Sequence, residues 1–173
     1  MLRQTAQSLT SAEIRSAPVQ QLIEFMRATM YDAPGVGLAA PQIGESLQLA
    51  VIEDKEIYHQ NLSEEELKLR KRKPIPFHVI VNPKLTIIKK KSVDFYEGCL
   101  SMAGFVGVVP RHLAVKVECL NEKGEPVMIN AEGWYARILQ HEIDHLHGIL
   151  CVDRTLSHTL STFDNYNRYH AKV

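Results

Sequence analysis

Hydrophobic residues recur at helical spacing near the start of this chain, after a proline that can occupy a first helical turn. The apolar positions that share one face are Leu22, Ile23, Met26 and Met30. This spacing predicts an amphipathic helix over about 17–31.

The middle of the chain changes to β-type patterns. Strand-like runs are LQLAVIE (47–53), HVIVNPKLTII (78–88) and HLAVKVECLN (112–121), and NEKGEPVMI supplies a hairpin turn with a glycine. Helical spacing returns over 133–147, and Gly148 is a good helix stop. The polar tail from Thr155 favours neither element. Because the sequence shows no internal repeat and no linker, we expect the strands and helices to share one α+β domain over 1–173.

Composition and charge exclude several classes of protein. Twenty basic and twenty acidic side chains cancel, so charge gives no reason to expect nucleic acid as a partner. No apolar run reaches the roughly 18 residues of a membrane span. Three cysteines are too few for a disulfide framework and indicate a reducing compartment. Residues 1–20 lack the apolar core of a secretory signal; a soluble protein is the favoured interpretation, and a remnant of an organelle address is the alternative.

Residues 54–77 form a charged segment between two predicted strands. Ser63 and Glu66 resemble a capping box, and KLRKRK (68–73) places five basic residues in six positions. A solvated surface insertion with a short helix is the favoured interpretation, and a weak anionic partner is the alternative.

QHEIDH (140–145) holds two histidines four residues apart. On a helix, His141 and His145 lie one turn apart on one face, so both imidazoles can reach one metal ion. Glu142 lies too far around the helix to be a natural third ligand, but it can reach a water on that ion. Only about 0.03 chance matches to H-E-x-x-H are expected in this composition, which favours a metal site over locally bonded histidines.

The third ligand stays open on the residues alone. A catalytic tetrahedral ion takes three protein ligands and keeps one position for water. Cys99 follows Gly98, which lets the backbone approach an ion, and Glu97 is another candidate. Cys119 and Cys151 are interpreted as small buried apolar residues.

Three blocks, in this order, resemble the signature motifs of the peptide deformylases. They are G-V-G-L-A-A-P-Q (35–42), E-G-C-L-S (97–101) and Q-H-E-I-D-H (140–145). The likeness covers about 17–155. It implies an α+β fold in which antiparallel or mixed sheets pack around a central helix that carries HExDH. It also implies that Cys99, His141 and His145 hold the metal, iron(II) in the first place, with zinc, nickel or cobalt able to substitute.

The same resemblance implies the reaction. A hydroxide on the metal attacks the formyl carbonyl of an N-formylmethionyl peptide, and formate is released. Glu142 carries the proton to the departing amine. The side-chain amide of Gln42 and the backbone N–H of Leu100 stabilise the oxyanion. The backbone at Val36 and Gly37 pairs with the extended peptide.

The resemblance and the residue types also predict roles for several further residues. Trp134, Val36 and Phe105 are candidates for an apolar side-chain pocket. Asp144 is expected to pair with Arg111, with Arg137 as the alternative. Val106, where bacterial relatives often carry arginine, and GWYAR (133–137) make the chain similar to the organellar branch of type 1 enzymes.

These expectations extend to partners and location. The substrates are N-formylmethionyl peptides and nascent chains near the ribosome, without a membrane or a specific nucleic acid as partner. A monomer is favoured, with a dimer as the alternative. A cytoplasmic location in a bacterial or viral source is favoured over a mitochondrion or plastid.

Two other functions compete. A zincin-type endopeptidase shares H-E-x-x-H, but it would leave EGCLS and GVGLAAPQ unexplained. A metal-bearing peptide-binding module without chemistry would need neither Glu142 nor Gln42.

Overall fold

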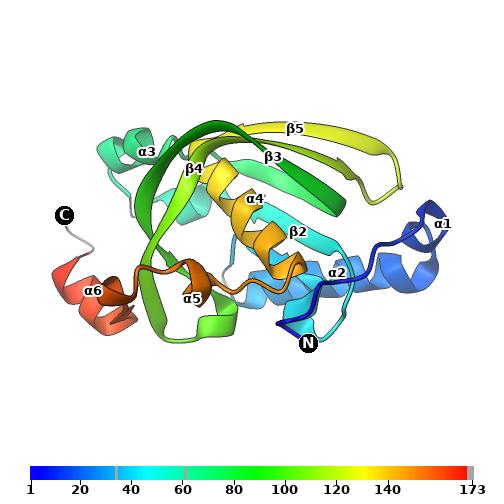
Figure 1. Cartoon of the computed structure of the whole chain (residues 1–173), viewed down its shortest axis with the longest axis horizontal. Coiled ribbons are helices and arrows are strands. Elements are labelled where there is room, and N and C mark those ends of the chain that lie inside the picture. The colour runs from blue at the N-terminus through cyan, green and yellow to red at the C-terminus, as the bar shows by residue number, and fades with distance from the viewer. Residues whose placement is uncertain (34, 61, 171–173) are drawn as a thin grey trace.

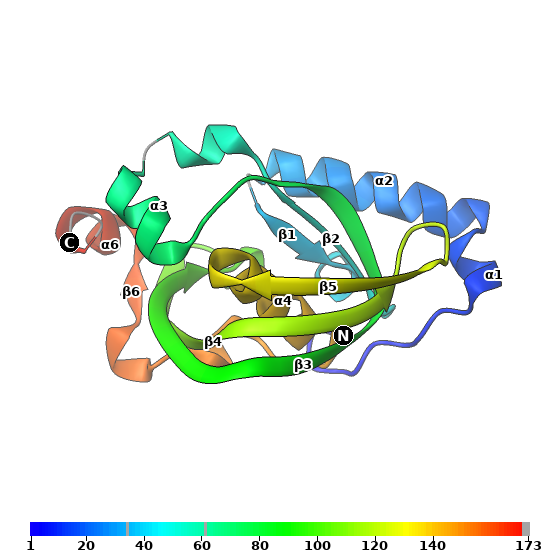
Figure 2. The ribbon, with the colours of Figure 1, turned by 90° about the horizontal axis from the view of Figure 1, so that it is seen from above.

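A computed structural model describes residues 1–33, 35–60 and 62–170. A six-stranded sheet curves around one central helix, α4 (Gly133–Leu146), as Figures 1 and 2 show. The strand order is β1-β2-β3-β4-β5, β6 pairs with β4, and all of these pairings are antiparallel. The strands are β1 (Gly37–Ala39), β2 (Leu49–Asp54), β3 (Ile75–Gly98), β4 (Phe105–Leu120), β5 (Pro126–Glu132) and β6 (Ser161–Thr162). The expected α+β fold with its central helix is confirmed.

Helices α2 (Ala17–Asp32) and α4 cover opposite faces of strand β2. Leu49 and Val51 belong to the core under α2, whereas Ala50 and Ile52 belong to the core around α4. Alternate residues of a strand face opposite sides, so a strand covered on both sides must be apolar throughout. This arrangement explains the continuous run LQLAVIE and confirms the helix predicted over 17–31 and the strand predicted over 47–53.

The long strands β3 and β4 bring the second motif to α4. β3 extends well beyond the predicted 78–88, and its pairing with β4 shifts register between Val81 and Lys84, Ile87 and Lys89, and Lys89 and Ser92. Such bulges bend a strand and interrupt its apolar–polar alternation, so the second half could not be recognised from pattern. β3 ends at Gly98, directly before Cys99.

The charged segment lies on the surface as predicted, and it is anchored. Ser63 and Glu66 form the predicted capping box of α3 (Glu64–Arg70), which contains no buried residue. Arg72 donates two hydrogen bonds of 2.8 Å to the buried carboxylate of Asp54 at the end of β2. This pair fixes the segment beside the sheet.

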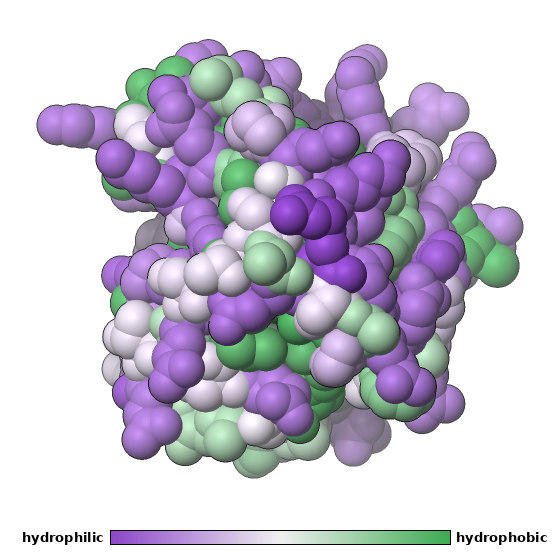
Figure 3. All heavy atoms as spheres, turned by 90° about the vertical axis from the view of Figure 1, so that its right-hand side faces the viewer, coloured by the Kyte–Doolittle hydropathy of each residue, from purple (hydrophilic) through white to green (hydrophobic). Residues whose placement is uncertain are grey.

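The polar tail forms short elements at one end of the molecule. They are the 3-10 turn η4 (Ser157–Thr159), β6 and α6 (Phe163–Tyr169), and the short helix α5 (Cys151–Arg154) precedes the tail. Figures 1 and 2 place α6 at the same end as α3, opposite α1 (Ser11–Ile14). The face at the α1 end is largely hydrophilic, with smaller apolar areas between polar residues (Figure 3). Within the described residues, none of the helices combines the length and apolarity needed to cross a membrane.

Candidate metal centre and active site

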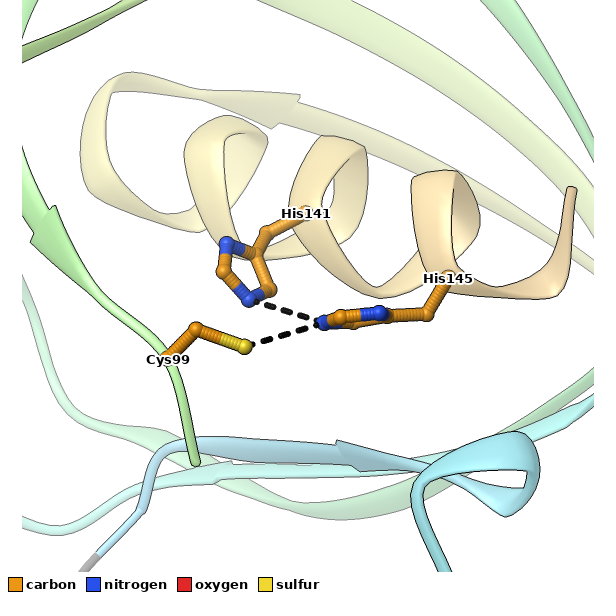
Figure 4. Close-up of side chains that lie close together, drawn as sticks. All are labelled: Cys99, His141 and His145. Carbon is orange, nitrogen blue, oxygen red and sulfur yellow. Dashed lines mark hydrogen bonds between the residues drawn. The ribbon is translucent and has the colours of Figure 1, made fainter. Parts of the chain in front are cut away.

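Two histidines of α4 and the cysteine after β3 converge on one point (Figure 4). Nε2 of His145 lies 3.2 Å from Nε2 of His141 and 3.2 Å from Sγ of Cys99. The helix supplies the histidines on adjacent turns, and the extended backbone of Cys99 delivers the sulfur from the opposite side. The structure therefore brings together the two histidines expected from the helical spacing and the cysteine that the family resemblance implied as the third ligand.

The chemistry of these donors fits a divalent transition metal. One thiolate and two imidazole nitrogens form a set that leaves a fourth tetrahedral position open. Burial lowers the pKa of His145 to about 3, and the neutral imidazole is the form that binds metal. Nδ1 of His141 lies 2.9 Å from Oε2 of Glu97, an arrangement that orients Nε2 toward the other two donors.

A second group of potential ligands, Glu97, His141 and Cys151, shares a histidine with the first. It is the poorer site, because the His141–Glu97 hydrogen bond already engages Nδ1. Cys151 is buried and does not line the cleft that reaches Cys99 and His141. The Cys99 group is therefore the better candidate for a metal site.

Glu97 is the centre of a buried ionic network behind the ligands. It accepts hydrogen bonds from Arg111 (3.1 Å to each oxygen) and from Arg137 (2.7 Å). Burial alone would raise the pKa of Glu97, but His141 and Arg111 hold it well below its usual range. Arg111 also pairs with Asp144, as expected, whereas Arg137 pairs with Glu97 instead.

Replacing Glu97 by alanine should lower the free energy of unfolding of the metal-free protein by about 3–5 kcal/mol, because two arginines lose a buried partner. The control is Glu118→Ala, since the exposed pair of Glu118 with Lys116 should contribute less than about 1 kcal/mol. Urea unfolding of both variants measures the difference. Equal losses would show that the network does not stabilise the fold.

A cleft of about 620 Å³ opens over the metal-binding group. Its walls come from the GVG segment, the end of β3, the turn after Cys99 and the side of α4 that carries His141 and Glu142. The residues predicted for substrate contact or catalysis that line it are Val36, Gly37, Gln42, Leu100, Trp134 and Glu142. Phe105 is not among the lining residues; it is the exposed first residue of β4 and lies opposite Thr162 of β6.

Glu142 is a buried carboxylate that faces this cleft. Its Oε2 has no hydrogen-bond partner among the described residues, and its side chain lies against Gly37. Burial raises the pKa of Glu142 to about 7. A carboxyl group with that pKa can take up and release a proton near neutral pH.

The absence of a side chain at Gly37 makes room for Glu142. A Cβ there would lie 2.3 Å from Oε1 and 2.9 Å from Cγ of the glutamate, too close for any real contact. Glycine is therefore required at position 37, the second glycine of GVGLAAPQ, because a side chain there would collide with Glu142. The sequence could not show it, because the two residues are 105 positions apart.

Gly37→Ala should therefore reduce turnover on the order of 10²-fold by displacing the carboxylate from its working position. Gly35→Ala is the matched comparison, because its Cβ would meet atoms no nearer than 3.4 Å; we expect at least a tenfold smaller loss. Initial rates at saturating peptide measure both. A Gly37→Ala enzyme as active as Gly35→Ala would contradict the steric role.

Gln42 presents its amide nitrogen to the ligand group. The backbone N–H of Ala39 donates to Oε1 of Gln42 (2.9 Å), which leaves Nε2 to donate toward Sγ of Cys99 (3.7 Å) and Oγ of Ser101 (3.2 Å). The 3-10 turn η1 (Ala40–Ile43) carries Gln42 into this position. A fixed donor beside the ligands is what an oxyanion requires.

The cleft residues that pattern reasoning missed include Arg72, Tyr96 and Phe163. Arg72 was interpreted as part of a solvated charge run, and Phe163 lies in the tail that showed no pattern. The ion pair with Asp54 and the pairing of β6 with β4 hold Arg72 and Phe163 in place. Neither long-range contact leaves a local sequence signal.

The sequence matches the family model of polypeptide deformylase over residues 1–160. The chain belongs to the polypeptide deformylase family. It is 46% identical over 165 residues to the chloroplastic peptide deformylase 1A of Solanum lycopersicum, which covers 95% of this chain and 60% of that protein. It is 38% identical over 173 residues to the human mitochondrial enzyme, which covers 100% of this chain and 69% of that protein.

A solved structure supports the fold of this deformylase-family chain. The Met-Ala-Ser-bound class I type b peptide deformylase of Acinetobacter baumannii matches with a TM-score of 0.77 and 34% identity, over 88% of this chain and 91% of that one. The chain spans 60–62% of the length of the first curated relatives. The resemblance to the family is therefore confirmed, and the family is a metal-dependent one.

Proposed function

We propose that this chain is a single-domain, metal-dependent hydrolase that removes the formyl group from the N-terminal formylmethionine of peptides and releases formate. The observation that carries the proposal is the position of Glu142. Glu142 lines a cleft that also reaches Cys99 and His141, and its buried Oε2 has no hydrogen-bond partner in the part of the chain that the structure describes. A carboxylate so placed serves as a proton carrier for water attacking a carbonyl group.

Cys99, His141 and His145 would hold the metal in this proposal. Iron(II) is the proposed ion, with zinc, nickel or cobalt as substitutes, because a thiolate–imidazole set suits these ions. When bound, the ion supplies Lewis acidity that activates water and polarises the formyl carbonyl.

The protein's own groups complete the reaction. Glu142 takes up the proton that water loses and passes it to the leaving amine. Gln42 Nε2 and the backbone N–H of Leu100 donate hydrogen bonds to the oxygen that gains negative charge. Gln42 is already oriented for this task by the hydrogen bond from Ala39. Asp144 and Arg111 contribute by fixing α4 and Glu97 behind the ligands.

The substrate would bind as an extra strand beside β1. β1 pairs with β2 along one edge and ends the strand order, so its other edge can face a peptide at Val36 and Gly37. Trp134 and Ile138 would line the pocket for the methionine side chain. The Met-Ala-Ser ligand of the A. baumannii relative is the deformylated form of such a peptide.

Nascent chains emerging from ribosomes are the proposed source of substrate, and a monomer is the proposed state. The names of the tomato and human relatives favour a plastid or mitochondrion over the cytoplasm. Three free cysteines agree with a reducing compartment in either case.

Formate release tests the proposal directly. Protein reconstituted anaerobically with iron(II), or with nickel(II), should release formate from formyl-Met-Ala-Ser and leave acetyl-Met-Ala-Ser intact. Cleavage of internal peptide bonds would instead identify an endopeptidase. Binding of the peptide without any formate would identify a module that has lost the chemistry.

A further inference from the structure

The segment after the family match contributes an aromatic wall to the cleft. The family match ends at residue 160, whereas Phe163 lines the cleft with the end of β3. Directly before Phe163, the two residues of β6 pair with Phe105 and Val106 of β4. The backbone N–H of Phe163 then donates a hydrogen bond to the carbonyl of Gly104 (3.1 Å). The ring position is therefore fixed by backbone pairing.

The ring occupies space that a missing side chain leaves free. A Cβ on Gly98 would lie 3.0 Å from Cζ of Phe163, so the ring lies directly over the residue that precedes Cys99. Tyr96 continues the same wall, because its ring packs against Tyr166 of α6 with a centroid distance of 4.8 Å. Phe163 is 44% exposed, which leaves apolar surface available for contact.

Strand alternation assigns this wall to one side of a bound peptide. Glu97 points toward α4, where it meets His141 and Arg137, so Tyr96 and Gly98 face the opposite side of β3. Successive side chains of an extended peptide also point to opposite sides. If its first side chain points toward Ile138 and Trp134, its second points toward Phe163.

We propose that Phe163 is a specificity-determining residue that favours an apolar side chain at the second position of the formylated peptide. This inference rests on the proposed deformylase function. Within the part of the chain that the structure describes, the rings of Tyr96 and Phe163 form this wall, and aromatic rings suit an apolar side chain.

The test compares formyl-Met-Leu-Ser with formyl-Met-Ser-Ser. The parent should show roughly tenfold higher kcat/KM for the leucine peptide, as expected for one apolar side chain in a pocket. Phe163→Ala should remove this preference by raising KM for the leucine peptide, with kcat unchanged, and Phe163→Leu should keep most of it. The control Tyr169→Ala removes a 62%-exposed ring of the same helix and should retain the preference. Equal melting temperatures exclude unfolding as the cause.

A binding measurement separates this inference from the proposed function. Trp134 is the single tryptophan of the chain and lines the cleft, so its fluorescence reports binding of Met-Leu-Ser and Met-Ser-Ser without turnover. A parent that releases no formate refutes the deformylase proposal, yet tighter binding of Met-Leu-Ser that is lost in Phe163→Ala would still support the role of Phe163. The role of Phe163 is overturned if the parent shows no preference for the leucine peptide over the serine peptide. It is also overturned if Phe163→Ala weakens binding and kcat/KM equally for both peptides.

Discussion

Replacing Glu142 by glutamine should lower formate release on the order of 10³-fold while the metal stays bound. Glutamine preserves the size of the side chain, but it cannot accept the proton that water must lose. The fold should be retained, since a buried carboxyl with its pKa raised to about 7 gains nothing from its charge in that environment. Metal content and the initial rate of formate release should be measured on the same preparation.

The matched control is Glu132→Gln, at the residue before α4, where the carboxylate is exposed and pairs with Lys71. It should keep the activity of the parent. If Glu142→Gln retained more than a tenth of the activity, another group would have to carry the proton.

Cys99→Ala should abolish both metal binding and activity. The thiolate is one of three donors, and the remaining imidazoles of His141 and His145 form an incomplete site. Parent protein should bind about one ion per chain, and the variant close to none. Because a ligand of the folded state stabilises it, nickel should raise the melting temperature of the parent and leave that of Cys99→Ala unchanged.

Two cysteines provide the controls for that experiment. Cys119→Ala and Cys151→Ala should keep the ion, since neither sulfur belongs to the Cys99 group. Loss of metal in Cys151→Ala with retention in Cys99→Ala would move the site to the group that contains Glu97.

Short-range patterns predicted the parts of the site that lie on one element. His141, Glu142 and His145 follow from the helical repeat, and α4 has nearly the predicted bounds. The choice of Cys99 needed the resemblance, because its distance from the histidines depends on how far β3 runs before it turns. Bulges near Lys89 conceal that length from the pattern.

Contacts between distant elements account for what the sequence did not predict. Glu97 was left as a possible ligand, yet its partners on β4 and α4 make it an anchor behind the ligands. Phe105 has the apolar character of a pocket residue, but it is exposed, pairs with Thr162 and does not line the cleft. Phe163 reaches the cleft through that same pairing, from a tail without periodicity. Residue type alone could not separate these two phenylalanines.

The most direct test of the central claim is X-ray absorption spectroscopy of the metal-loaded protein. A centre built by Cys99, His141 and His145 predicts one sulfur and two imidazole nitrogens in the first coordination shell, and loss of the sulfur signal in Cys99→Ala. A shell of nitrogen and oxygen alone in the parent, or a sulfur signal that persists in Cys99→Ala, would contradict the account.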